Sequence, residues 1–111
     1  MIAGGGLVIG LISGQQAEIE RLCDAFGVVR LEVFGSAKRR NDFEFGRSDL
    51  DFLVTFSPNY RNDVEQFLAF EEALSALLGQ PIDLVEREAV EQSRNPLRKS
   101  AILGSAALVY G

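Results

Sequence analysis

The chain has 111 residues, of which 47% are hydrophobic and 24% are charged, and its net charge at pH 7 is −5. This length and composition predict one small globular domain over residues 1–111 with a modest core. The acidic balance argues against direct nucleic-acid binding, the single cysteine excludes an internal disulfide, and the absence of histidine excludes Ser-His-Asp catalysis and most zinc sites.

The opening segment, residues 1–14, is apolar and rich in glycine. It is too short to span a membrane and lacks the basic start of a signal peptide, so we expect a cytoplasmic protein without a membrane anchor. A weak strand, a disordered lead-in and an overlong start remain alternatives for it. Apolar spacing over residues 15–26 then predicts a helix that ends at Gly27 and buries Cys23.

Two strands are predicted on either side of a polar segment. Residues 28–34 and 49–56 are rich in β-branched and apolar side chains. Between them, the glycine-serine pair at 35–36 breaks the first strand, and a short helix is expected to begin at Ser36. Residues 41–48 have the composition of a loop.

The longest predicted helix covers residues 63–78. Asp63 suits its N-terminal cap, and Gly79 suits its end. Its inward-facing stripe is predicted to consist of six apolar residues: Val64, Phe67, Leu68, Leu74, Leu77 and Leu78.

Three further elements follow. Residues 81–86 predict a third strand, residues 95–103 a helix with Pro96 at its first position, and residues 106–110 a closing strand. The order of elements predicts an α+β fold, in which helices cover a small mixed β-sheet.

Three aspartates suggest a metal site. Asp49 and Asp51 are two apart in a strand, so they project to the same side, with Cα atoms about 7 Å apart. Asp83 joins them if its strand lies beside theirs. Carboxylates that repel one another are stabilised by hard divalent cations such as Mg²⁺ or Mn²⁺. Two such ions on the order of 4 Å apart support in-line phosphoryl or nucleotidyl transfer without histidine.

The segment after the first strand suits a phosphate group. Gly35 allows close backbone approach, and Ser36 offers a hydroxyl and the N-terminus of a short helix. The loop that follows is basic, with Lys38, Arg39, Arg40 and Arg47. Each motif alone has a plainer interpretation as a turn or a solvated surface, and their combined order is what favours the nucleotide site.

These residues resemble the DNA polymerase β-like nucleotidyltransferase superfamily. The resemblance rests on Gly-Ser, a loop, Asp-x-Asp on a strand and a later Asp on a neighbouring strand. The stretches "RLEVFGSA", "SDLDFLVTF", "LLGQPIDLVE" and "NPLRKSAIL" are similar, in that order, to the minimal nucleotidyltransferase (MNT) proteins. The similarity covers roughly residues 17–110.

The resemblance implies a nucleotidyltransferase fold and an antitoxin role beside a HEPN-family RNase toxin, with which a hetero-oligomer could form. It implies AMP transfer from ATP to a tyrosine of that toxin. Asp49 and Asp51 would bind both metal ions, and Asp83 would bind the ion that activates the acceptor. Gly35 and Ser36 would hold the β and γ phosphates, and Arg39 would lie near them.

Two other functions remain open at this point. A non-catalytic antitoxin could neutralise a HEPN toxin by binding alone, although three converging acids would serve no purpose there. A small-molecule nucleotidyltransferase is disfavoured because the sequence shows no second, substrate-binding domain.

Overall fold

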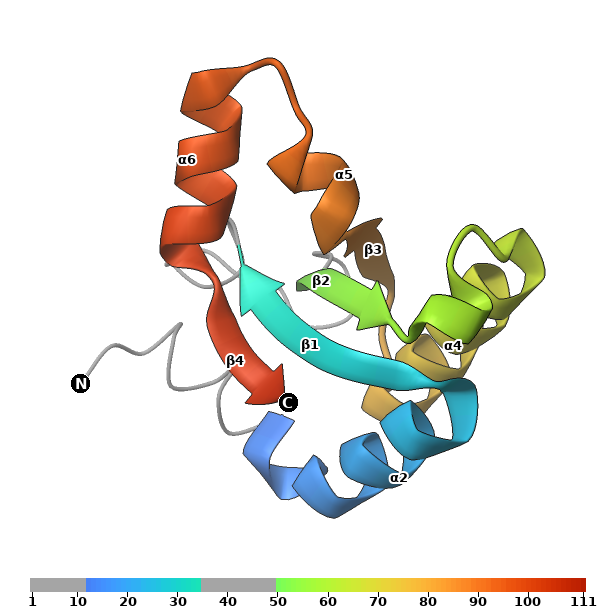
Figure 1. Cartoon of the computed structure of the whole chain (residues 1–111). Coiled ribbons are helices and arrows are strands. Elements are labelled where there is room, and N and C mark those ends of the chain that lie inside the picture. The colour runs from blue at the N-terminus through green and yellow to red at the C-terminus, as the bar shows by residue number, and fades with distance from the viewer. Residues whose placement is uncertain (1–11, 35–49) are drawn as a thin grey trace.

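The computed structural model describes residues 12–34 and 50–111 (Figure 1). Residues 12–14 are helical and lead into α2, so the end of the predicted lead-in is structured. The elements are α2 (Gln16–Phe26), β1 (Val28–Phe34), β2 (Leu50–Phe56), the short 3-10 helix η1 (Pro58–Tyr60), α4 (Val64–Leu78), β3 (Ile82–Glu86), α5 (Arg87–Glu91), α6 (Pro96–Ser105) and β4 (Ala107–Tyr110).

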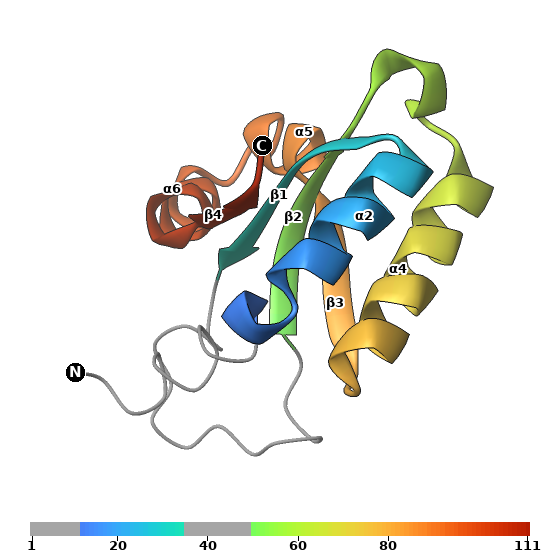
Figure 2. The same cartoon turned by 90° about the horizontal axis from the view of Figure 1, so that it is seen from below.

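The four described strands form one mixed sheet in the order β3-β2-β1-β4. β1 pairs with β2 and with β4 in the antiparallel sense, whereas β2 and β3 are parallel. Helices α2 and α4 cover one face of the sheet, and α5 and α6 cover the other (Figure 2). The α+β fold with a small mixed sheet is therefore confirmed.

The main core lies between the sheet and the α2–α4 layer. Ile12 belongs to it, as do Ile19 and Cys23 of α2, which are fully buried as predicted for this helix. The other buried members come from all described elements of this layer: Val28, Leu31, Val33, Leu50, Phe52, Val54, Phe56, Phe70, Leu74, Leu78 and Leu84.

A smaller core occupies the opposite face. Phe34 of β1 and Leu53 of β2 pack there against Val90 of α5 and Ile102 of α6. Because side chains alternate along a strand, every second residue of β1 and β2 points to this thinner layer. The charged residues of both strands lie on this side.

Four predicted helix boundaries are confirmed. The Asp63 carboxylate accepts a hydrogen bond from the Gln66 N–H at 3.0 Å and caps α4. Gly27 and Gly79 end α2 and α4 in the left-handed conformation, at φ 73° and 75°. Pro96 is the first residue of α6, as expected.

Two details of the sequence prediction were wrong. On α4, Val64 and Leu68 are exposed (67% and 54%), whereas Phe70, absent from the predicted stripe, is fully buried. At 100° per residue, the buried side of α4 centres on Phe70, Leu74 and Leu78, which lie at i, i+4, i+8. The one-turn helix α5 was also missed, since no cap or glycine separates it from β3. None of the described helices is long and apolar enough to cross a membrane.

Candidate active site

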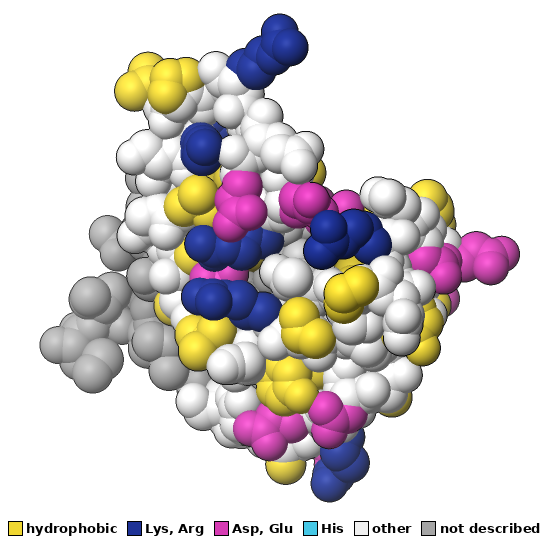
Figure 3. Space-filling view, viewed as in Figure 1, with side chains coloured by type: hydrophobic (Ala, Val, Ile, Leu, Met, Phe, Trp, Pro, Cys, Tyr) yellow, Lys and Arg dark blue, Asp and Glu magenta, His cyan; other side chains and the backbone are white. Residues whose placement is uncertain are grey.

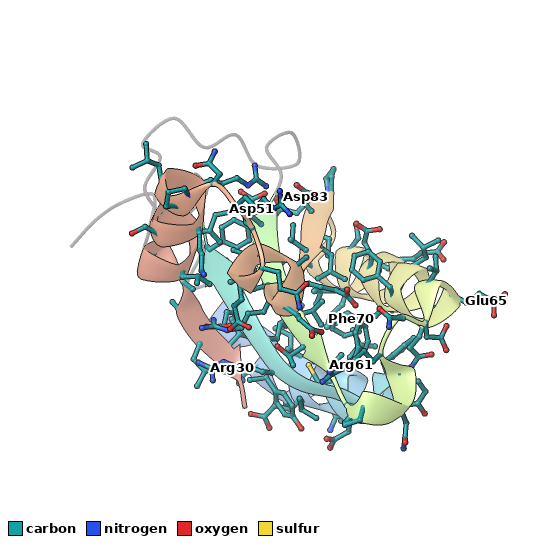
Figure 4. The ribbon with its side chains drawn as sticks, turned by 45° about the horizontal axis from the view of Figure 1, so that its top comes forward. Arg30, Asp51, Arg61, Glu65, Phe70 and Asp83 are labelled. Carbon is teal, nitrogen blue, oxygen red and sulfur yellow. The ribbon has the colours of Figure 1, made fainter. Side chains whose placement is uncertain are left out.

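The structure brings two of the predicted carboxylates together. Asp51 on β2 and Asp83 on β3 are direct register partners in the parallel pair. Neighbouring strands lie about 4.8 Å apart, and residues opposite one another in register point to the same face. Figure 4 shows the two aspartates side by side at one end of β2 and β3, far from Arg61 at the other end.

Burial of their neighbours fixes the direction of both aspartates. Leu50 and Phe52 are fully buried, and Leu84 is 6% exposed, all three in the α2–α4 core. Period-two alternation therefore turns Asp51 and Asp83 to the α5–α6 face, where Asp51 is half-buried and Asp83 is exposed. The apolar residues around each aspartate thus set the geometry of the pair.

The remaining predicted site residues, Gly35, Ser36, Arg39 and Asp49, lie outside the described residues. Their sequence neighbours are described. Phe34, which precedes Gly35, is the register partner of Asp51, so β1 ends where β2 begins. The described part supplies two of the three predicted acids and contains no group of three side chains suited to a metal ion.

The donor chemistry of the pair suits a hard divalent cation. Asp51 and Asp83 offer carboxylate oxygens, the ligand type that Mg²⁺ and Mn²⁺ prefer. Two acids directly opposite one another repel, and a bound cation removes that repulsion. Asp83 is exposed, so its carboxylate is accessible from solvent.

A buried ion pair lies on the same face of the sheet and was not foreseen from the sequence. Glu32 of β1 is 4% exposed, and Arg87 at the start of α5 donates through Nη1 to both of its oxygens, at 2.7 and 2.9 Å. Arg30 Nε lies 3.3 Å from the same carboxylate. Figure 3 shows acidic and basic side chains gathered below α5 and α6. An acid between two apolar residues, Leu31 and Val33, was the available signal.

The electrostatics of Arg87 reflect this pairing. Burial acts to lower the pKa of its guanidinium, but hydrogen bonds and attraction to Glu32 and Glu91 outweigh burial and raise the pKa above its ordinary value. Arg87 therefore stays charged and keeps its bond to Glu32.

A second polar group missed from the sequence lies beside the carboxylate end. Gln80 is 4% exposed, and its side-chain amide has no hydrogen-bond partner within the described residues. It directly precedes Pro81, whose carbonyl accepts a hydrogen bond from the Leu50 N–H at 3.4 Å. No sequence signal distinguishes Gln80 from an ordinary turn residue after a helix.

A cavity of about 480 Å³ lies elsewhere. Cys23, Asp24, Gly27, Val28 and Tyr110 are among its lining residues. Val28 is the first residue of β1, whereas the partner of Asp51 is the last, so this cavity belongs to the other end of the strand. Neither Asp51 nor Asp83, the two described site residues, lines it.

Comparison with known proteins identifies the family of the chain. The family model described as "Nucleotidyltransferase domain" matches residues 18–109. A Methanocaldococcus jannaschii protein named "Putative protein adenylyltransferase" is 36% identical over 83 residues, which cover 73% of this chain and 76% of that protein.

Solved structures give the same fold. One described as a "putative minimal nucleotidyltransferase" matches with a TM-score of 0.65 at 29% identity and covers 86% of this chain and 89% of that chain. A complex of tri-AMPylated Shewanella oneidensis HEPN toxin with MNT antitoxin contains a chain that matches with a TM-score of 0.58 at 17% identity, over 90% of this chain and 72% of that chain. The second match, at its low identity, concerns the fold alone. The predicted resemblance is thereby confirmed, and the chain belongs to the nucleotidyltransferase domain family, as an enzyme of that class.

Proposed function

We propose that this nucleotidyltransferase moves AMP from ATP to a hydroxyl group, a tyrosine, on a partner protein of the HEPN toxin family, and so acts as an antitoxin in the cytoplasm. The observation that carries the proposal is the register pairing of Asp51 with Asp83 at one end of the sheet. The name of the M. jannaschii relative and the AMP-modified toxin in the Shewanella complex support the choice of AMP and of a protein acceptor.

In the proposed reaction, the acceptor oxygen forms a bond to the α phosphorus of ATP. The bond between that phosphorus and the α–β bridging oxygen breaks, pyrophosphate leaves, and the hydroxyl proton is released. The product is a phosphodiester between AMP and the acceptor side chain. The net reaction needs no oxidant or further co-reactant.

In the proposed site, the carboxylates bind the metal ions. Asp51 and Asp83, with Asp49, would hold two Mg²⁺ ions, or Mn²⁺ in their place. Bound there, the ions would supply charge neutralisation for the phosphates and a lowered pKa for the attacking hydroxyl. Gly35, Ser36 and Arg39 would bind the phosphate groups of ATP.

The test uses the purified chain, a HEPN-family protein as candidate partner, Mg²⁺, and ATP labelled at either the α or the γ phosphorus. We expect the α label on the partner and no transfer of the γ label, because AMP carries only the α phosphate. Mass spectrometry should locate the added AMP on tyrosine. Transfer of the γ label would instead identify a kinase-like reaction and contradict the proposal.

Variants separate catalysis from binding. Asp51→Asn and Asp83→Asn should abolish labelling, whereas Glu65→Gln should not, because Glu65 is exposed on α4, away from the aspartates (Figure 4). If wild-type protein neutralises the partner without labelling it, and both Asn variants do so equally well, the chain acts by binding alone. Labelling of a small molecule in place of the partner would favour an antibiotic-modifying type of enzyme.

A further inference from the structure

The strand register arranges the α5–α6 face in rows. Phe34, Asp51 and Asp83 form one row across β1, β2 and β3. The next row consists of Glu32, Leu53 and Val85. Rows on one face are two residues apart, about 6.6 Å along the strands.

The Glu32–Arg87 ion pair spans the sheet next to the carboxylate row. Arg87 follows β3 directly, two residues after Val85, so the pair joins β1 to the end of β3 across the buried Leu53 of β2. The Glu32 side chain is only 5% exposed and that of Arg87 25% exposed. Low exposure and two short bonds make this contact much more directional than a surface ion pair.

The strand that it restrains carries Asp83. Among the described strands, β3 is at the edge of the sheet and pairs only with β2. Like charges directly opposite one another weaken a strand pair, so the contact between Asp51 and Asp83 does not itself hold β3 against β2. The attraction between Glu32 and Arg87 draws the end of β3 toward β1. Glu32 lies one row from the aspartates, and Arg87 lies four residues after Asp83 in the chain.

We propose that Glu32 and Arg87 are positioning residues of the active site, which hold the end of the edge strand β3 and keep Asp83 beside Asp51 in a geometry ready for a divalent cation. This inference rests on the proposed metal-dependent function. The pair contacts no reacting group, and its effect reaches the site through the spacing of β2 and β3.

Either partner can be replaced without leaving the other as an unpaired buried charge. After Arg87→Gln, Glu32 keeps Arg30 at 3.3 Å. After Glu32→Gln, Arg87 keeps Glu91, whose carboxylate accepts from Nε at 2.9 Å. Both variants should therefore fold. Arg87→Lys keeps the charge but not the two-oxygen contact, and serves as the conservative variant.

The measurement is direct Mn²⁺ binding without ATP, by electron paramagnetic resonance of the free ion, together with the Mn²⁺ dependence of AMP transfer. We expect both variants to bind Mn²⁺ about 10- to 100-fold more weakly, in the range found for residues that orient metal ligands. The Mn²⁺ concentration for half-maximal transfer should rise in parallel, while the rate at saturating Mn²⁺ falls less than about threefold. Arg87→Lys should lie between these variants and wild type.

Two controls distinguish positioning from general loss of stability. Ile19→Val weakens the opposite core, and Arg61→Gln removes an exposed ion pair of 3.7 Å with Glu88 on α5. Neither should change Mn²⁺ affinity. Unchanged affinity in Glu32→Gln and Arg87→Gln, or an equal loss in Ile19→Val, would overturn the proposal, as would failure of both variants to fold.

The result also separates this inference from the proposed function. If wild-type protein binds Mn²⁺ but transfers no AMP, the proposed function fails, and Mn²⁺ affinity alone still decides the role of the ion pair. If wild-type protein binds no Mn²⁺, both proposals fail together. If wild type binds and transfers, and the variants match it, only the positioning role is lost.

Discussion

Replacing Asp83 with asparagine should stabilise the metal-free protein and abolish AMP transfer. The two effects have one cause, because the carboxylate that would bind a cation faces another carboxylate across the β2–β3 ladder. Asparagine keeps the shape of the side chain and removes its charge. If Asp83 instead supported the fold, the Asp83→Asn protein would be less stable than wild type.

The structure sets the size of the effect. With side chains about 5 Å apart, Coulomb repulsion is about 0.8 kcal/mol at the dielectric constant of water and about 3 kcal/mol at an effective value of 20. Asp83 is exposed and Asp51 half-buried, which favours the lower figure, and like charges opposite in a sheet cost about 0.2–1 kcal/mol. A gain of about 1 kcal/mol raises the Tm of a domain of this size by roughly 4 °C.

Thermal unfolding followed by circular dichroism in EDTA measures this gain. The increase in Tm should be smaller in 1 M NaCl, because the screening length there is about 3 Å and the repulsion is weaker. Excess Mn²⁺ should make wild type the more stable of the two proteins, because a ligand at 100 times its Kd stabilises wild type by about 2.7 kcal/mol and the variant by much less. Glu65→Gln should shift neither measurement. A Tm several degrees below wild type in EDTA would show that Asp83 supports the fold, and would refute the repulsion argument.

Three further predictions concern the scaffold. Burial raises the pKa of the Cys23 thiol from 9.0 to about 12, so the thiolate forms more readily in the unfolded chain. The free energy of unfolding should be unaffected below pH 9 and should fall by about 1.4 kcal/mol per pH unit between pH 9 and 12. Urea titrations of wild type and Cys23→Ala at several pH values measure this fall. Phe70→Ala should cost about 3 to 5 kcal/mol in the same assay, because Phe70 is fully buried against two other phenylalanine rings; a loss below 1 kcal/mol would contradict its place in the core. Asp63→Ala should cost about 1 kcal/mol through loss of the α4 cap, whereas Val64→Ala, at an exposed position, should cost less than half of that.

The parts of the fold that the sequence predicts are those with local causes. Gly27 and Gly79 mark helix ends because a left-handed residue is needed there, and Asp63 and Pro96 mark helix starts through capping and a fixed φ. The Asp51–Asp83 pairing needed one non-local assumption, that their strands are neighbours. The motif order supplied that assumption through the family resemblance.

The features that sequence reasoning missed depend on contacts between distant segments. The buried side of α4 packs against α2 and the sheet and centres on Phe70, whereas Leu68 of the predicted stripe is exposed. The Glu32–Arg87 pair joins residues 55 positions apart. An acid between two apolar strand residues indicates that some partner exists, but only the β3–α5 junction identifies Arg87 as that partner.

The two faces of the sheet divide stability and chemistry between them. The α2–α4 face holds the larger described core, and the α5–α6 face has four buried apolar residues beside its charged groups. A face that must keep two carboxylates close together cannot also be filled with apolar side chains, because ionised acids lose too much hydration there. The destabilising charges are therefore on the face that contributes less apolar burial, and an ion pair rather than more packing restrains the edge strand there. We therefore expect that Asp51 and Asp83 can be replaced without unfolding the chain, whereas loss of Phe70 on the other face should be severe.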